Sequence, residues 1–187
     1  MLERIHKIGL FLVFCLFISC ASYTKQPSET QKLLGQEMWL VTNLRVFENN
    51  HIYWQNYGHG KILSLGTSIR LIRSTSDTVS FLDNQSNEYT LYWRKDAKSE
   101  WEKEMPKYFS QKDTQEAIQS LEEDWQKEIF FGNVQKGMTK EMVLWSRGYP
   151  VLPSDYEKED IWMYYENQAK QVLIYFENNA VVHIVGP

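Results

Sequence analysis

The sequence predicts an α+β protein in two parts: a small antiparallel β-barrel or sandwich, then a helix–helix–three-stranded antiparallel sheet module. Short runs of alternating apolar and polar residues recur about every ten residues over 36–94, as in small barrels and sandwiches. Apolar residues then recur at helical spacing after residue 113, and short strand-like runs close the chain. The 187 residues, 43% of them hydrophobic, suffice for one or two small cores.

Residues 1–19 have the composition of an export signal. A basic start with Arg4 and Lys7 precedes an apolar run, 8–18, that is shorter than the roughly 20 residues of a membrane-spanning helix. The run ends at Ser19-Cys20-Ala21, which resembles the lipobox of bacterial lipoproteins. In that motif a small residue precedes a cysteine that is acylated and becomes the new N-terminus. We therefore expect a signal peptide over 1–19 and attachment to a lipid bilayer through Cys20.

Cysteine usage agrees with an anchor at Cys20. The only other cysteine, Cys15, lies inside the expected signal, so the mature chain would hold a single thiol and no internal disulfide. Phe17 stands where lipoproteins usually carry Leu. An uncleaved signal anchor and an ordinary cleaved signal peptide are the alternatives. By resemblance to lipoprotein sorting in enterobacteria, Ala21 favours the outer over the inner membrane, with the rest of the chain in the periplasm or at the cell surface.

The first part of the mature chain is expected to divide into three segments. Residues 20–35 are polar and form a flexible tether, 36–94 form the β-rich domain, and 95–112 are charged and form a linker. Asn49-Asn50 is a plausible tight turn, because Asn tolerates positive φ. The run 66–70 resembles small SH3-like barrels, which implies that architecture for the β-rich domain.

Residues 113–187 are expected to form the α+β module. Asp113 is placed to cap a helix, with Glu116 completing a capping box. Four apolar residues follow at helical spacing, and Gly132-Asn133 ends the helix: Ile118, Leu121, Trp125 and Ile129.

A second, short helix is expected after Thr139. Thr139 would cap it, and Glu141 would lie in its first turn, where the helix dipole favours an acid. Gly148 would end it in a left-handed conformation, two residues before Pro150. Three strand-like runs follow, with Asn178-Asn179 as the turn between the last two: 161–165, 171–177 and 180–185.

The order of these motifs resembles the SmpA/OmlA (BamE-like) family of small outer-membrane lipoproteins. The residues that carry the resemblance are Gly137-Met138-Thr139-Lys140-Glu141, Gly148-Tyr149-Pro150 and the strand with Trp162 and Tyr164. The resemblance covers under a third of the chain. It implies a non-enzymatic, protein-binding or scaffold role within an envelope protein complex, in outer-membrane assembly or integrity. The partner-binding residues would be Lys136, Met138, Lys140, Trp162 and Tyr164.

A peptidoglycan-binding or other glycan-binding lipoprotein is the alternative. Aromatic residues are dense in one strand-like run of the β-rich domain, and exposed aromatic rings can stack on sugars. The candidate stacking residues are Tyr53, Trp54 and Tyr57.

Other functional classes lack support in the sequence. The formal net charge is −4, without the basic surplus or stripe of a nucleic-acid-binding protein. The sequence contains no phosphate-binding glycine-rich loop or nucleophile elbow, and nothing singles out a carboxylate pair. The histidines after the expected signal, His51, His59 and His183, lie outside ligand motifs. We therefore expect no catalytic residues, metal or cofactor.

The expected anchor predicts the behaviour of Cys20→Ser. Because acyl chains hold the protein in the bilayer by burying methylenes, the variant should lose detergent-phase partitioning and accumulate as a soluble or unprocessed protein. Phase separation in detergent measures this directly. A variant that partitions like the wild type, with residues 1–19 still attached, would contradict the lipoprotein interpretation.

Overall fold

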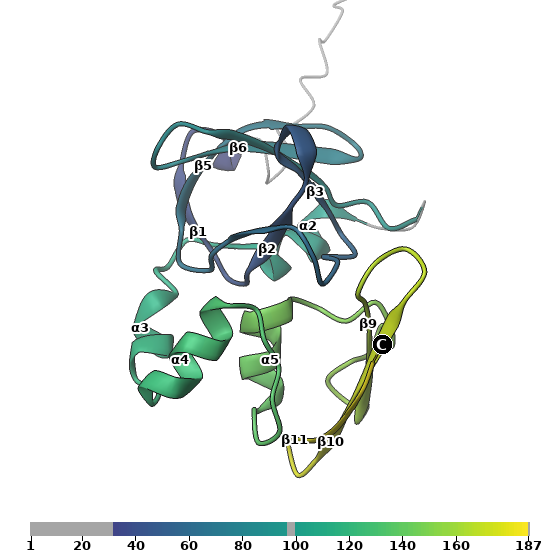
Figure 1. Ribbon diagram of the computed structural model, residues 1–187. Helices are drawn as coiled ribbons and strands as arrows, with labels where there is room; N and C mark the ends of the chain where they lie inside the picture. The colour runs from purple at the N-terminus through teal and green to yellow at the C-terminus, as the bar shows by residue number, and fades with distance from the viewer. Residues whose placement is uncertain (1–31, 97–99, 187) are drawn as a thin grey trace, which may run out of the picture.

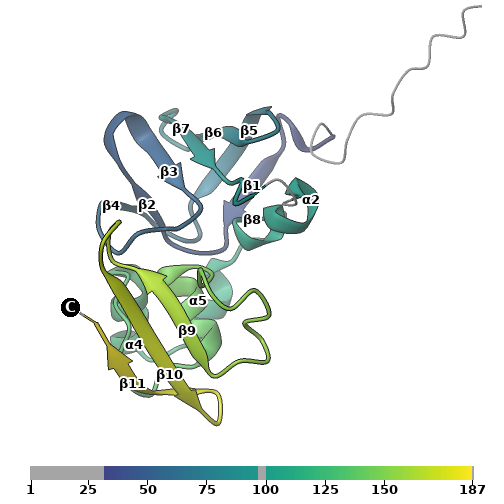
Figure 2. The same ribbon diagram turned by 90° about the vertical axis from the view of Figure 1, so that its right-hand side faces the viewer.

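The computed structural model describes residues 32–96 and 100–186 (Figure 1). The expected signal peptide, the anchor at Cys20 and most of the expected tether lie outside these residues. Two layers are visible: a curled eight-stranded sheet, and below it three short helices with a separate three-stranded antiparallel sheet (Figures 1 and 2). The expected α+β class is therefore confirmed.

The eight-stranded sheet curls into a half-barrel whose strands come mainly from residues 37–92. Its strand order is β4-β2-β3-β7-β6-β5-β1-β8. The expectation of a purely antiparallel sheet is wrong at one place, because β3 and β7 run parallel. The strands are β1 (Glu37–Leu40), β2 (Leu44–Val46), β3 (His51–Tyr53), β4 (Lys61–Leu63), β5 (Ser68–Ser74), β6 (Thr78–Asp83), β7 (Glu88–Tyr92) and β8 (Phe109–Ser110).

The core of the half-barrel follows the alternation read from the sequence. Side chains two residues apart share one face of a strand, and the inward ones are large and apolar. Pairs such as Met38 with Leu40, and Val79 with Phe81, are completely buried. Leu71 and Leu91 fill the same core from the neighbouring strands.

The segment 95–112 differs from the linker that was expected. It contains α2 (Trp101–Glu104), a 3-10 turn η2 (Met105–Lys107) and β8, which pairs with β1. Trp101, Tyr108 and Phe109 are buried in the core of the half-barrel. Burying large aromatic surfaces stabilises more than leaving them on a solvated linker would, at about 25 cal/mol per Å² of apolar surface.

The second layer builds its own core between helices and the small sheet. Its elements are α3 (Gln115–Gln119), α4 (Glu123–Phe130), α5 (Lys140–Arg147), β9 (Ile161–Tyr165), β10 (Gln171–Glu177) and β11 (Ala180–Val185). The sheet order is β11-β10-β9, and both pairs are antiparallel. Trp162, Tyr164 and Phe176 pack inward against α5 residues such as Val143. Leu65, between β4 and β5, joins this second core.

The expected first helix is interrupted. Asp113 Oδ1 accepts a hydrogen bond from the Gln115 amide at 2.8 Å, and no capping box forms with Glu116. The backbone leaves helical geometry at Glu122, where ψ is 145°. The second layer therefore holds three short helices where two were expected.

The local signals around α5 and the last hairpin are confirmed. Thr139 Oγ1 accepts a hydrogen bond from the Met142 amide at 3.2 Å, and Glu141 lies in the first turn. Asn178 and Asn179 adopt positive φ values of 49° and 66° in the turn between β10 and β11.

The two layers meet where α5 ends. The last four carbonyls of a helix lack partners within the helix and need donors from elsewhere. Thr42 Oγ1 donates to the carbonyl of Leu144 at 2.6 Å, and the backbone N–H of Asn43 donates to the carbonyl of Trp145 at 3.0 Å. Donors in the half-barrel therefore satisfy the end of α5.

Two buried asparagine side chains complete this junction. Asn43 Nδ2 donates to the carbonyls of Ile129 and Ser146, while its Oδ1 accepts from the Leu65 amide at 2.9 Å. Asn56 Nδ2 donates to the carbonyls of Asn43 and Arg147 at 2.8 and 2.9 Å. Each side chain bridges both layers, and because both are buried, truncating either one would leave orphaned polar groups inside the molecule.

Gly148 ends α5 with positive φ, as expected, but not in the left-handed helical conformation. Its φ is 77° and its ψ is −164°, a region open essentially to glycine alone. A Cβ at this position would lie 2.9 Å from Asn56 Nδ2 and 3.4 Å from Thr42 Oγ1. The glycine therefore lets the half-barrel donors approach the helix end.

Gly148→Ala is expected to lower the free energy of unfolding by about 1–3 kcal/mol, through backbone strain and displacement of Asn56. Gly35→Ala is the matched control, because Gly35 has a φ of 81° and a Cβ added there would meet nothing within 4 Å. Equilibrium urea unfolding measures both. Equal losses would show that the junction tolerates a methyl group and would contradict the close approach at Gly148.

Candidate functional site: an aromatic cleft between the layers

A cleft of about 730 Å³ opens where the half-barrel meets the turn between β9 and β10. We call it the aromatic cleft. Its walls come from three segments far apart in sequence: the end of β2 through β3, the loop that follows β3, and the β9–β10 turn. The lining residues are Phe47, Glu48, Asn49, His51, Tyr53, Tyr57, His59, Asn167, Gln168 and Ala169.

The 3-10 turn η1 (Glu48–Asn50) shapes one wall of the cleft. Asn49 and Asn50 have φ values of 58° and 56°, so the expected tight turn is confirmed. The turn reverses the chain so that the Phe47 amide donates to the carbonyl of His51 at 2.8 Å. Both side chains are thereby presented to the same cavity.

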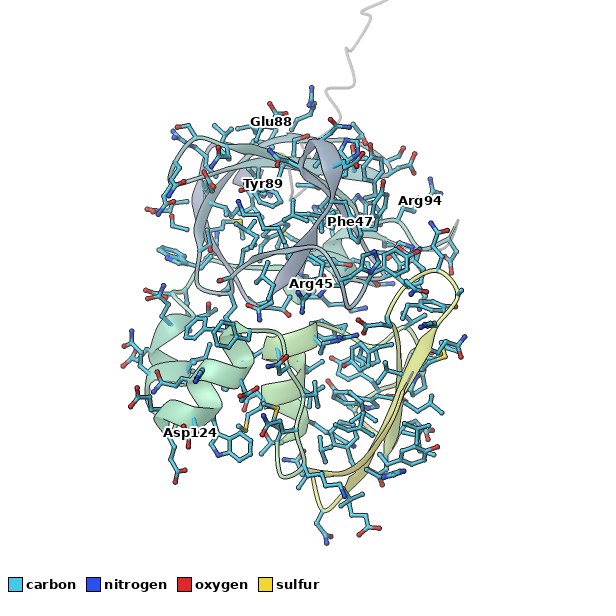
Figure 3. The ribbon with its side chains drawn as sticks, viewed as in Figure 1. Arg45, Phe47, Glu88, Tyr89, Arg94 and Asp124 are labelled. Carbon is cyan, nitrogen blue, oxygen red and sulfur yellow. The ribbon has the colours of Figure 1, made fainter. Side chains whose placement is uncertain are left out.

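Phe47 is the centre of the aromatic wall. Its ring meets the rings of Tyr53, Tyr57 and His59 edge-on, with centroids 5.6, 5.9 and 5.0 Å away. Such edge-to-face contacts favour fixed ring orientations. Figure 3 labels Phe47 on the half-barrel.

Two further tyrosines support the wall from neighbouring strands. Tyr53 stacks on Tyr92 of β7 at 5.3 Å, a contact made possible by the parallel pairing of β3 and β7. Tyr57 contacts Tyr165 of β9 at 6.2 Å, across the boundary between the layers. The cleft is therefore a joint product of the half-barrel and the small sheet.

The polar atoms of the cleft suit a neutral hydrogen-bonding ligand. Burial raises the pKa of the Tyr57 phenol, and Tyr165 and Tyr53 add to the shift, so this hydroxyl stays protonated and can donate. His59 Nδ1 lies 2.7 Å from the carbonyl oxygen of Glu166. A carbonyl oxygen only accepts hydrogen bonds, so in this contact His59 Nδ1 carries the proton and donates it.

The residues that line the cleft carry little formal charge, which indicates the class of ligand that the cleft can bind. Among the described residues that line the cleft, Glu48 alone carries a carboxylate, and none is a lysine or an arginine. Amide side chains from Asn49, Asn167 and Gln168 supply both donors and acceptors. Aromatic rings together with amides and few charges match an uncharged, polyhydroxylated ligand better than an anion.

The structure separates the three aromatic residues proposed for sugar stacking. Tyr53 and Tyr57 lie in the aromatic cleft, whereas Trp54 lines a different cavity of about 300 Å³ with Tyr149 and Tyr156. β3 ends at Tyr53, and Trp54 lies in the turn that follows, where the chain leaves the sheet. Lys95 Nζ lies over the Trp54 ring, 5.0 Å from its centroid.

The expected partner-binding set does not form one exposed surface. Met138, Trp162 and Tyr164 are completely buried in the second core, so they cannot contact a partner directly. Alternation along β9 turns positions 162 and 164 toward α5. Lys136 is exposed. Lys140 is largely covered, with its Nζ 3.0 Å from Asp160.

The sequence does not point to the cleft residues as a group. Phe47 and the turn residues Asn167 and Gln168 carried no motif. His51 and His59 were noted only as histidines outside ligand motifs. Their meeting depends on long-range contacts, which a single sequence does not reveal.

Compared with known protein families and with curated protein sequences, the chain matches none. The SmpA/OmlA likeness therefore stays a prediction that rests on its short motifs. Over residues 32–96 and 100–186, the helices are all too short or too polar to cross a membrane. The same residues bring together no group of three or more His, Cys, Asp or Glu side chains suited to a metal ion.

Tyr164 gives a pH-dependent prediction. Its hydroxyl donates to the Gly148 carbonyl at 3.0 Å, and burial raises its pKa well above that of an ordinary tyrosine. The unfolded chain loses this proton near pH 10, so the stability contribution is complete below about pH 10 and falls as the pH rises further.

Tyr164→Phe should therefore cost about 1–3 kcal/mol at neutral pH, because the Gly148 carbonyl loses its donor. It should also weaken the alkaline loss of stability, to which buried Tyr108 and half-buried Tyr156 still contribute. Urea unfolding between neutral and alkaline pH measures both effects, with Tyr175→Phe as the control for losing a hydroxyl. An alkaline slope identical to that of the wild type would contradict the assignment.

Proposed function

We propose that this chain is a non-enzymatic, membrane-tethered lipoprotein of the bacterial cell envelope that binds a glycan in the aromatic cleft. The observation that carries the proposal is the cleft itself: aromatic rings, amides and a single carboxylate around one cavity. The tether is the acylated Cys20, and the outer membrane is the favoured location. The proposal includes an SH3-like architecture for the half-barrel, as a small β-scaffold that presents aromatic side chains.

The dimensions of the cleft support a sugar ligand. Its volume of about 730 Å³ falls within the range of small-molecule sites, roughly 300–1,000 Å³. The apolar faces of sugar rings can pack on Tyr53 and Tyr57, while Asn167 and Gln168 come from the β9–β10 turn, where they can bind hydroxyl or acetamido groups. Peptidoglycan is the glycan that an envelope lipoprotein would meet.

A protein-binding or scaffold function, as implied by the SmpA/OmlA likeness, is the second candidate. One observation favours it. Ile161 and Val185, on the outer strands of the small sheet, are 49% and 45% exposed, and Leu152 beside β9 is 53% exposed. An apolar surface of this kind is a candidate for contact with an envelope protein.

Retention on purified peptidoglycan tests the glycan proposal. Tyr57→Leu should abolish retention, because the proposed binding depends on ring stacking and on the phenol as a donor. Trp54→Leu is the matched control, since Trp54 lies in the other cavity, and it should be retained like the wild type. Circular dichroism and thermal unfolding of both variants establish that they fold.

Two outcomes would overturn the glycan proposal. One is a wild-type chain that peptidoglycan does not retain, and the other is equal retention of wild type and Tyr57→Leu. Co-purification from solubilised envelopes then separates the second candidate, because recovery of a partner that is lost in Ile161→Glu would favour protein binding through the small sheet.

A further inference from the structure

Another cavity at the junction of the layers is lined by two arginines. It has a volume of about 280 Å³, and Gly58 and Glu166 contribute to its lining. Arg45 comes from β2 and Arg147 from the end of α5. Figure 3 labels Arg45 on the underside of the half-barrel, where it faces the helices. We call this cavity the arginine pocket.

The two arginines carry more positive charge than the described carboxylates paired with them can neutralise. Of the described carboxylates, only Glu166 forms an ion pair with either guanidinium. Its Oε2 accepts from Arg147 Nη1 and Nη2 at 3.3 and 3.4 Å, which are long for a charge-assisted pair. Arg45 Nη1 donates to the carbonyl of Gly60 at 3.3 Å. Within the described part of the chain, two cations therefore face one carboxylate.

The positive charge is concentrated and partly shielded from water. The Arg147 side chain is 11% exposed. The pKa of Arg45 is lowered, first by burial and then by the charge of Arg147, while Glu166 partly offsets the shift. Each guanidinium carries five N–H donors, of which few have partners in the described part of the chain.

The surrounding residues hold the guanidiniums in place. Arg147 lies over the Tyr164 ring, 5.6 Å from its centroid. Gly132 leaves room for Arg45, because a Cβ at Gly132 would overlap Arg45 Nη2. Gly58 leaves room for the Glu166 carboxylate in the same way. Since the groups are positioned before any ligand arrives, little ordering cost remains for binding.

We propose that Arg45 and Arg147 form a binding site for a small oxyanion, a carboxylate or a phosphate group carried on a short apolar body. The guanidinium forks match the geometry of both oxyanions. The apolar body would lie against the aliphatic wall formed by Val172, Ile174 and Ile184. This site is separate from the aromatic cleft and does not depend on the glycan proposal.

A purely structural ion pair is the competing explanation, and it makes different predictions. A structural pair needs one cation for each carboxylate, whereas the second guanidinium here adds repulsion that a bound anion would relieve. Binding of an anion to the folded state should therefore raise the melting temperature with a saturable dose dependence.

The experiment titrates the full chain, in non-ionic detergent, with sodium phosphate, acetate or butyrate at constant ionic strength, against a chloride reference. The arginine Nε–Hε resonances of Arg45 and Arg147 should shift and saturate, and thermal stability should rise above the chloride reference. Tighter binding of butyrate than of acetate or phosphate would assign a carboxylate with an apolar body. Tightest binding of phosphate would assign a phosphate group.

Two variants and a control test whether the anion binds at the arginine pocket. Arg45→Gln should weaken binding about tenfold or more through loss of a charge-assisted contact. Arg73→Gln, which removes an exposed arginine paired with Glu88, should bind like the wild type. Glu166→Gln should bind more tightly than the wild type, because it neutralises the competing carboxylate while keeping an acceptor for Arg147.

The proposal fails if no anion gives saturable shifts in the wild type, or if Arg45→Gln binds as well as the wild type. It also fails if Glu166→Gln loses stability without any gain in anion affinity, as a structural ion pair requires. Should Arg45→Gln not fold, Arg45→Lys takes its place. The lysine retains the charge but not the planar fork, so weaker binding is again expected.

Discussion

The carboxyl end of α5 sets the arrangement of the whole molecule. Its last carbonyls point into the junction, where they would be buried without partners if the half-barrel did not supply donors. Thr42, Asn43 and Asn56 supply them, and the Asn43 and Asn56 side chains use their remaining atoms to bind the half-barrel and the loop that carries Leu65. The helix end and the half-barrel therefore cannot separate without exposing several hydrogen-bonding groups at once. The two cores are separate clusters of apolar residues. These polar contacts, together with Leu65 packing into the second core, hold the cores in one relative position.

This fixed position explains why both proposed sites lie at the boundary between the layers. Arg147 is the last residue of α5, and Arg45 follows Leu44 in β2, so the capping contacts also bring the two guanidiniums together. At the aromatic cleft, the loop after β3 reaches the small sheet, where the Gly58 amide donates to the carbonyl of Tyr165 at 2.9 Å. Tyr57 meets Tyr165 as a result. Neither layer contains a complete site by itself.

Several signals within a few residues of one another predicted local structure correctly, although the capping box of Asp113 and Glu116 did not form. Pairing between distant segments could not be predicted from such signals. Thr139 as a cap and Asn178-Asn179 as a turn depend on neighbouring backbone atoms, so the sequence alone sufficed. The parallel pairing of β3 with β7 and the addition of β8 next to β1 join residues far apart, and no local pattern encodes them. The aromatic pair Trp162 and Tyr164 shows a related problem: alternation predicts two faces of a strand but does not say which face is covered. Tyr53 and Tyr57 do line one cavity, while Trp54 between them points to another.

Glu166 connects the two proposed sites through different atoms of one residue. Its backbone carbonyl accepts from His59 in the aromatic cleft, and its carboxylate accepts from Arg147 in the arginine pocket. An anion that competes for Arg147 would release the carboxylate of a residue whose backbone positions one wall of the cleft. Any effect of anion binding on cleft affinity must then be matched by an equal effect of cleft occupancy on anion affinity, because coupling between two binding equilibria is reciprocal. Since both sites use Glu166, the strength of the coupling depends on how far the Glu166 backbone moves when its carboxylate moves. The Gly58 contact restrains that movement, since the carboxylate packs directly against the glycine.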